Sequence, residues 1–283
     1  MFKITYDNIF WIGVFEMIFQ KKSPKDKEWK LLLKQEDKML KKRENKKESQ
    51  INKLLEDKVP EKLQSTLNAA FRKAFEIVFS KGSGIIEKTY DKEKYDFEYE
   101  NRERWHAETG NRRSLKSFSK AASAGKNKNI LLSGIEGAGM GALGVGIPDI
   151  PVFTGVILKS IYEVAMSYGF EYESDFEKFF ILKIIEVSMQ ESDKFEKQND
   201  ELNRFIDEVD KYEFVVEKED IDYQIAAAAN SVSKEMLYMK FVQGIPVIGI
   251  AGGLTNTVYL KKIVDYAELK YRRRFLISKG KVL

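Results

Sequence analysis

Glycine is concentrated in two short stretches of this 283-residue chain, and that placement limits what the chain can fold into. Eleven of the 18 glycines and three of the five prolines fall within residues 134–155 and 244–253. Gly137 and Gly141 are four residues apart, as are Gly249 and Gly253. On a helix this spacing makes a flat strip of small residues, against which a second backbone packs closely. Because each glycine costs a helix about 1 kcal/mol, we expect close packing to be the purpose of both strips.

Helical periodicity dominates the rest of the chain, whereas alternation with a period of two is scarce, so the sequence predicts an all-α fold. We expect longer helices near 25–57, 60–79, 148–168, 190–211, 220–242 and 254–276, with two or three shorter ones within 85–126. Ser174 and Glu177 precede an apolar run with the spacing of a capping box, which marks a helix start. Gly169 is expected to end the preceding helix.

The block from Gly134 to Pro151 is expected to form a helical hairpin that is packed inside the protein or half-inserted in a membrane. An uninterrupted membrane span is disfavoured, because Asp149 lies in mid-stretch and a proline lies near it on each side. Asp149 is expected to cap the helix that follows it. Catalysis or cation binding is the alternative role for this carboxylate, although no partner for it is visible.

Composition excludes several kinds of active site. Without cysteine there is no disulfide and no Cys-ligated zinc, and a single histidine, His106, excludes a two-His metal site. A Ser-His-acid triad would have to use His106, which lies in a charged stretch that reads as surface. Residues 82–89 imitate a phosphate-binding loop, but Glu87 stands where that motif needs its second glycine. We therefore expect no metal and no cofactor.

The net charge of +4 hides a strong partition along the chain. Residues 171–222 carry 18 acidic and 7 basic side chains, which leaves an excess of +15 for the remainder. A basic excess favours anionic surfaces, either nucleic acid or lipid headgroups. Nucleic-acid binding is disfavoured because the basic residues of 21–62 are interleaved with acids and no zinc-finger or RNP-type motif is present. The acidic segment is expected to be a solvated face.

The first residues carry an aromatic stripe at helical spacing: Phe2, Tyr6, Phe10, Trp11, Phe15 and Phe19. A helix that docks on the core explains it, and a helix lying in a membrane surface is the alternative. The stretch lacks the pattern of a signal peptide, since it contains Asp7 and Glu16 and no small-residue cleavage site. Together with the absence of cysteine, this favours a cytoplasmic location.

Several motifs follow one another in a specific order. Ile147-Pro148-Asp149-Ile150-Pro151 follows the glycine-rich block, and Tyr168-Gly169-Phe170 ends the next helix. Further on come Ile245-Pro246-Val247-Ile248-Gly249, then Thr255-Asn256, and then a final helix that contains Tyr271-Arg272-Arg273-Arg274-Phe275-Leu276. This series resembles the EcsC family of bacterial proteins over roughly residues 60–278. Residues 1–58 are then an N-terminal helical extension and residues 59–283 the EcsC-like domain, in which the acidic insert is longer than the family pattern requires.

The resemblance implies a helical, intracellular protein that works near a membrane, and it carries no catalytic residue over to this chain. The family-motif positions are Gly134, Gly137, Gly141, Gly144, Pro148, Asp149, Pro151, Tyr168, Gly169, Pro246, Gly249, Gly253 and Asn256. The family is named for a gene that accompanies an ABC transporter. The partner that we expect is a membrane surface or a membrane protein, and the oligomeric state is left open.

Three functions are therefore open. The first is a non-enzymatic protein, peripheral to the inner face of the membrane, with Lys270, Arg272, Arg273 and Arg274 as contacts for anionic lipid. The second is a hydrolase that uses Asp149 or Glu163 together with His106. The third is a membrane-perturbing effector of a bacterial conflict system, whose glycine-rich hairpin inserts on activation.

Overall fold

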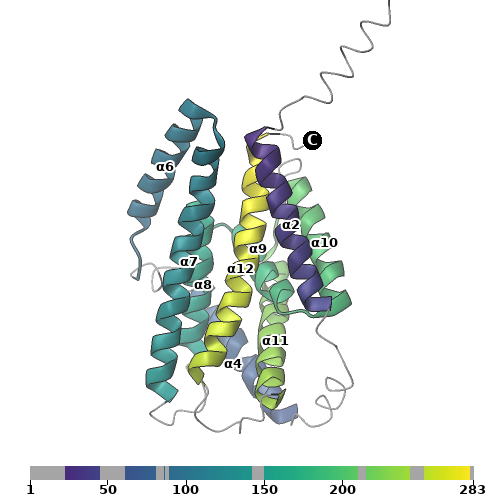
Figure 1. Ribbon diagram of the computed structural model, residues 1–283. Helices are drawn as coiled ribbons and strands as arrows, with labels where there is room; N and C mark the ends of the chain where they lie inside the picture. Colours follow the sequence, from purple (N-terminus) through teal and green to yellow (C-terminus); the bar gives the residue numbers. More distant parts are fainter. Residues whose placement is uncertain are drawn as a thin grey trace, which may run out of the picture.

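The computed structural model describes residues 23–44, 61–80, 86, 89–141, 150–209, 215–242 and 252–280, and its ordered elements in these ranges are helices. They are α2 (Pro24–Glu44), α4 (Glu61–Ser80), α6 (Lys92–Thr109), α7 (Arg112–Gly141), α8 (Ile150–Ser167), α9 (Asp175–Ser188), α10 (Ser192–Val209), α11 (Lys218–Val242) and α12 (Gly252–Ser278). The long helices run along one common direction (Figure 1). The predicted all-α class is confirmed. The turn of the predicted hairpin, residues 142–149, lies outside the described residues, as do the aromatic stripe and residues 45–60.

Local sequence signals set two of the helix ends as predicted. The Ser174 hydroxyl accepts a hydrogen bond from the backbone N–H of Glu177 at 3.1 Å, which starts α9. Gly169 ends α8 with a φ of 79°, and the N–H of Phe170 reaches back to the carbonyl of Ala165 at 3.0 Å. Glycine is required there for a second reason: a Cβ on Gly169 would lie 2.2 Å from the ring of Tyr99.

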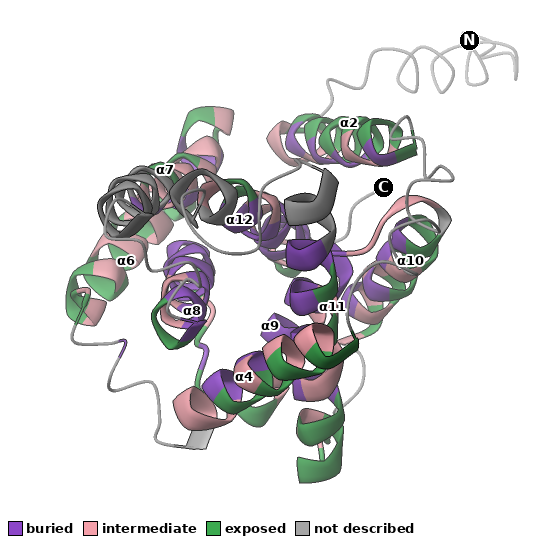
Figure 2. Ribbon diagram, turned by 90° about the horizontal axis from the view of Figure 1, so that it is seen from below, coloured by how far each residue is buried: buried purple, intermediate pink, exposed green. Residues whose placement is uncertain are grey.

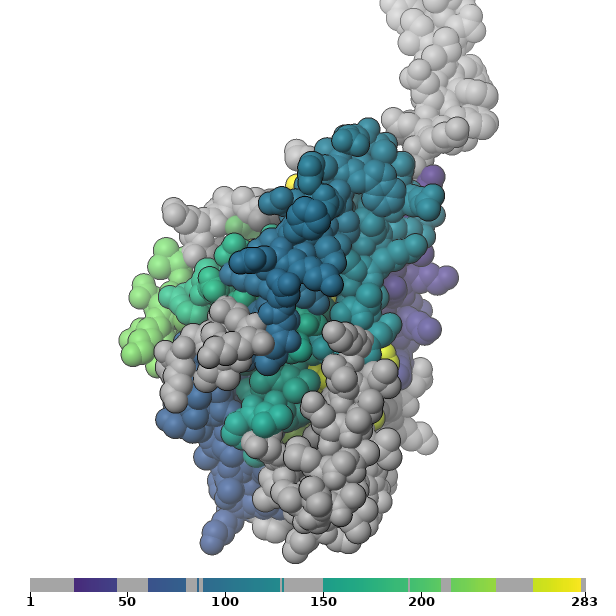
Figure 3. Space-filling model, turned by 90° about the vertical axis from the view of Figure 1, so that its left-hand side faces the viewer, coloured from purple at the N-terminus to yellow at the C-terminus, as the bar shows by residue number. Residues whose placement is uncertain are grey.

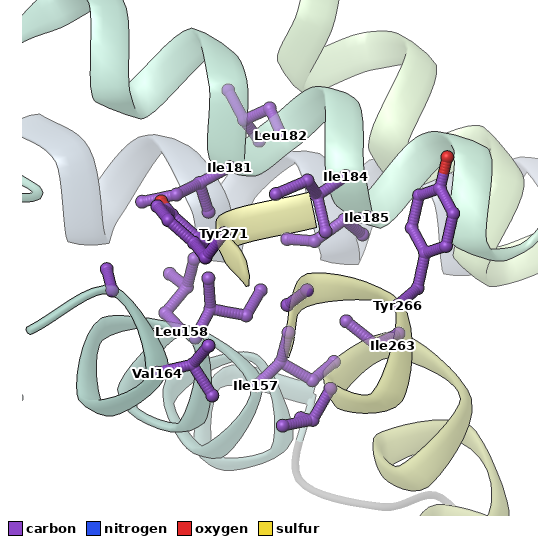
Figure 4. Packing of buried hydrophobic residues seen from close by; sticks show 14 of the residues in the cluster. Ile157, Leu158, Val164, Ile181, Leu182, Ile184, Ile185, Ile263, Tyr266 and Tyr271 are labelled. Atoms are coloured by element: carbon purple, nitrogen blue, oxygen red, sulfur yellow. The ribbon is translucent and has the colours of Figure 1, made fainter. Parts of the chain in front are cut away.

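The core lies between α8, α9 and α12. Figure 4 shows the packing of the aliphatic side chains, with Ile157 and Leu158 of α8, Ile181 and Ile185 of α9, and Ile263 of α12, all fully buried. Each such side chain contributes about 1.5–3 kcal/mol on leaving water. Buried residues concentrate on these central helices, whereas exposed residues mark α2, α6 and α10 at the rim (Figure 2). α6 lies on the outside of the bundle (Figure 3).

Tyrosine makes up an unusual share of this core. Six tyrosines are among the largest fully buried side chains: Tyr162, Tyr168, Tyr172, Tyr259, Tyr266 and Tyr271. Five of these hydroxyls have polar partners, as buried hydroxyls require: for example, the Tyr168 hydroxyl lies 3.2 Å from Ser119 Oγ, and the Tyr259 hydroxyl donates to the carbonyl of Glu235 at 3.1 Å. The core is therefore cross-linked by hydrogen bonds as well as packed by apolar contact.

α8 is also long and apolar enough to cross a membrane, with a mean hydropathy of 1.3 over Ile150–Ser167. Within the bundle, 72% of that window is buried. A core helix of a soluble protein has the same two properties, so the apolar character of α8 is explained by its central position.

α2 packs against α12, α10 and α7, although it belongs to the segment that we expected to be an extension. Leu32 is 1% exposed and contributes to the same core as the other helices. The boundary expected between residues 58 and 59 lies outside the described residues, but residues 24–44 on its N-terminal side are part of the bundle.

Candidate functional site

The most unusual chemistry lies beneath α2, where the cations of α12 meet carboxylates of other helices. Lys270 is completely buried, and its Nζ donates hydrogen bonds to Glu36 Oε1 at 2.7 Å and to the Oδ1 atoms of Asn199 and Asn203 at 2.6 Å each. The side-chain amides of both asparagines donate in turn to Glu36 Oε1, at 3.0 and 2.8 Å. The result is a closed network that joins α2, α10 and α12.

Burial perturbs both charges of this network. It lowers the pKa of Lys270 to about 8, although the neighbouring Glu36 opposes the shift. Burial alone would raise the pKa of Glu36, but the charge of Lys270 and the hydrogen bonds from Lys270, Asn203 and Asn199 hold it below its usual value. At neutral pH the pair is therefore ionised.

A second ion pair lies about two turns away along α2, because Glu28 precedes Glu36 by eight residues. Glu28 is 2% exposed, and its carboxylate accepts hydrogen bonds from Arg272 at 2.7 Å and from Arg112 of α7 at 2.7 Å. Arg273, 8% exposed, bonds to Asp207 of α10 at 3.0 and 3.1 Å and lies 3.6 Å from Glu36.

Arg274 pairs with a carboxylate of α9 and not with one of α2. Its guanidinium binds the carboxylate of Glu177 and lies over the rings of Phe170, Phe176 and Phe180, with 4.3 Å to the nearest centroid. The Tyr271 hydroxyl donates to the same carboxylate at 3.0 Å. Burial raises the pKa of Glu177 even though Arg274 and these hydrogen bonds oppose the rise. The Glu177 carboxylate thus makes long-range contacts here, beyond the local role that its place in the capping box predicts.

These placements correct the expected lipid contact. Lys270, Arg272 and Arg273 are buried, and the side chain of Arg274 is 12% exposed. Cations enclosed between helices and paired with carboxylates are not available to lipid headgroups, so we do not propose that contact further. The solvated-face prediction for 171–222 is also corrected in part, because Glu177 and Glu186 of this segment are buried.

The groups of the hydrolase alternative do not meet. His106 Nδ1 lies 2.9 Å from Ser114 Oγ near the start of α7, and burial followed by the charge of Lys279 lowers its pKa. Glu163 accepts a hydrogen bond from Asn129 further along α7. Ser114 and Asn129, the α7 partners of His106 and Glu163, are 15 residues apart, which is about 22 Å along a helix that rises 1.5 Å per residue. Asp149 lies outside the described residues. In the part of the chain that the structure describes, no group of three acidic or histidine side chains could hold a metal.

The glycine-rich parts of α7 and α12 lie level with each other. The two helices are antiparallel: Ser123 bonds to Glu268 at 2.6 Å, and Lys126 bonds to Asp265 at 3.1 Å. Continued one residue for one residue, this register places Gly137 level with Leu254, and Gly139 level with Gly252. α7 and α12 pack against each other, and Figure 1 shows these ends of the two helices side by side.

Two stretches of sequence that contribute helix ends there carry almost no charge. Residues 241–260 contain no Asp, Glu, Lys, Arg or His, and residues 130–158 contain only Glu136 and Asp149, in a chain that is 33% charged. Val152 in the first turn of α8 is 48% exposed, and Val258 near the start of α12 is 51% exposed. Pro151 beside Val152 is also exposed.

The other family-motif positions divide into those inside the bundle and those not described. Tyr168 is buried in the core and Gly169, which is exposed, follows it at the end of α8. Gly134 and Gly141 belong to α7, and Gly253 and Asn256 belong to α12. Gly144, Pro148, Pro246 and Gly249 lie outside the described residues. What sequence reasoning missed was Glu28 and Glu36. Their signal is a spacing of four around Leu32, which puts all three on one helix face.

The comparisons with known proteins agree with the order of motifs. The family model described as "EcsC protein family" matches residues 26–276, a range that includes most of α2. Protein EcsC of Bacillus subtilis is 23% identical over 252 residues, which cover 88% of this chain and 92% of that protein. The comparison with solved structures gives no match. Because the family model matches most of the chain, this protein belongs to the EcsC family.

Proposed function

We propose that this protein is a non-enzymatic, cytoplasmic, helical protein that associates peripherally with a membrane through the glycine-rich end of its bundle. The observation that carries the proposal is that the ends of α7, α8, α11 and α12 that belong to two nearly uncharged sequence segments, 130–158 and 241–260, meet at one end of the fold. Apolar surface that faces water at a helix end marks a site for a membrane or a protein partner.

The geometry suits a peripheral contact better than a span. α8 is enclosed by other helices over most of its surface, so it is not free to enter a bilayer without opening the core. Val152 and Val258, in contrast, are half exposed on helices whose ends meet there. Valine, isoleucine and proline side chains at such an end gain free energy by entering the boundary between headgroups and acyl chains.

The register of α7 against α12 supports the same proposal. Glycines at one level on two neighbouring helices allow the backbones to pack closely. The paired cations of α12 lie toward the other end of that helix. Binding is therefore expected to depend on apolar contact and to change little between neutral and anionic vesicles.

Flotation of the full chain with phosphatidylcholine vesicles, and with the same vesicles containing phosphatidylserine, tests the proposal. Val152→Asp combined with Val258→Asp places two carboxylates at the contact and is expected to reduce the bound fraction about tenfold or more. Val215→Asp is the matched control, because Val215 is 75% exposed and precedes α11, whose 25 residues separate it from the glycine-rich end by about 37 Å. Failure of the wild-type chain to float, or an equal loss with the control, would refute the proposal.

A dye-leakage measurement on the same vesicles separates peripheral binding from the effector alternative. A peripheral protein floats with vesicles and leaves an enclosed dye inside. Release of the dye at the concentrations that give flotation would support a membrane-perturbing activity in its place.

A further inference from the structure

α2 is a peripheral helix that contributes one fully buried apolar side chain to the core. Of its 21 residues four are buried, and three of these are charged: Glu28, Glu36 and Arg43. Leu32 is its fully buried apolar residue. By comparison, α8 buries 13 of its 18 residues.

Ion pairs, more than apolar contacts, hold α2 against the bundle. A buried ion pair recovers little more than the cost of desolvating its two charges, whereas apolar burial has no such opposing cost. The Glu28 and Glu36 pairs therefore hold α2 less firmly than apolar burial of the same extent would, although loss of either carboxylate leaves buried cations unpaired and weakens the contact. Elements of this kind open before the rest of a protein unfolds.

The surface that α2 covers is strongly basic. Arg112 of α7 and Lys270, Arg272 and Arg273 of α12 contact α2, and we call these four residues the cationic groove. Asp207 pairs with Arg273 from the side of α10, and Asp200 of α10 lies near Lys270. Even with both aspartates counted, removal of Glu28 and Glu36 leaves the groove with an excess of positive charge.

An emptied groove would hold unpaired, poorly solvated cations, which is unfavourable. Departure of α2 is therefore favoured only when another anionic helix takes its place. Sixteen residues, 45–60, separate α2 from α4 along the chain, so α2 can leave without displacing α4.

We propose that α2 is an exchangeable cover, and that the cationic groove binds an acidic amphipathic helix of a partner protein. The groove sets the pattern of that helix: two carboxylates eight residues apart with an aliphatic residue midway, as in Glu28, Leu32 and Glu36. Asn199 and Asn203 add specificity, because their amides donate to the second carboxylate and their carbonyl oxygens accept from Lys270.

A labelled peptide of residues 23–44 is the probe, and fluorescence anisotropy with the full chain is the readout. The chain with Glu28→Gln and Glu36→Gln holds its own α2 weakly, so the peptide is expected to bind it at least tenfold more tightly than it binds wild type. The control chain carries Asp37→Asn and Glu44→Gln, two exposed carboxylates of the same helix, and is expected to behave as wild type. A peptide with Gln at positions 28 and 36 should bind none of the three chains.

Hydrogen exchange of the wild-type chain tests the exchangeable cover without any substitution. Amides of α2 are expected to exchange through an opening that leaves α8 and α9 protected. The proposal is overturned if α2 loses protection only together with α8 and α9. It is also overturned if the peptide binds the chain with Glu28→Gln and Glu36→Gln no more tightly than it binds the control chain. A wild-type dimer in which two copies exchange α2 would overturn it as well.

Discussion

Replacement of Arg274 by glutamine tests whether the cations of α12 serve the fold or face a ligand. The substitution removes the ionic partner of Glu177, whose side chain is 6% exposed, and leaves a shorter, neutral polar side chain in its place. Tyr271 remains as a neutral donor to the carboxylate. Because Arg274 contacts Glu177 and phenylalanine rings inside the bundle, the expected effect is a loss of stability, and any loss of membrane or partner binding is secondary.

The expected magnitude follows from leaving a buried carboxylate unpaired, which costs about 3–5 kcal/mol. Loss of the contacts with the three phenylalanine rings adds up to about 1 kcal/mol. A loss near 4 kcal/mol lowers the melting temperature by roughly 10 °C in a chain of this size.

The loss is also expected to depend on pH. Burial holds the pKa of Glu177 above its ordinary value in the folded chain, and removal of Arg274 takes away a charge that opposes the rise. The folded variant therefore binds a proton before the unfolded chain does, so its stability rises as the pH falls from 7.5 toward 5.

Urea denaturation at pH 7.5 and at pH 5 checks both expectations. Glu177→Gln combined with Arg274→Gln should recover at least half of the loss, because no buried charge is then unpaired. Arg72→Gln is the control, since the pair of Arg72 with Glu76 is exposed and contributes about 0.5 kcal/mol or less. A loss for Arg274→Gln below 1 kcal/mol, or one equal at the two pH values, would refute the reasoning.

Three further predictions concern single positions. In thermal melts, Gly169→Ala should lower the free energy of unfolding by about 2 kcal/mol or more, because the positive φ costs about 1–2 kcal/mol and the new Cβ clashes with Tyr99. Gly155→Ala should raise it by about 0.5–1 kcal/mol, because a Cβ there meets nothing within 4 Å. Ser174→Ala should cost about 1 kcal/mol in the same melts through loss of the α9 cap. Burial lowers the pKa of Lys270 to about 8 in the folded chain, so above pH 8 the folded chain holds fewer protons than the unfolded chain. The free energy of unfolding, measured by urea denaturation, should therefore rise from pH 8 to 9.5, and Lys270→Met should reduce this increase.

The local parts of the fold could be predicted from the sequence because their causes are local. The capping serine at position 174 and the terminating glycine at position 169 act on backbone groups within five residues of themselves. The apolar run that becomes α8 likewise predicts a helix by its own composition. Each of these features depends on residues that are neighbours in the chain.

The buried charges could not be predicted in the same way. Lys270 and Glu36 are separated by 234 residues, and each lies in a stretch whose composition is typical of a solvated helix. A charged residue enters a core only when its partner is already there, and a local pattern holds no information about a distant partner. For the same reason α2 was expected to belong to an extension, and its place in the bundle emerges only with the fold.

The glycine strips occupy an intermediate position. Their spacing of four predicted close packing, but the identity of the opposite helix depends on the register of α7 against α12. That register is set by Ser123, Lys126, Asp265 and Glu268, polar residues well away from either strip. The sequence therefore predicts a close contact for each strip. The polar pairs between α7 and α12 determine which residues of the two helices lie opposite each other.

The absorbance of the buried tyrosines reports the unfolding of the protein at high pH. Burial raises the pKa of Tyr168, Tyr259, Tyr266 and Tyr271, so their phenols stay neutral at a pH where those of an unfolded chain ionise. Each retained proton then favours the unfolded state as the pH rises, and these contributions add. We expect the phenolate absorbance that these four side chains contribute to lag behind that of free tyrosine and then to rise steeply at the pH where the bundle opens.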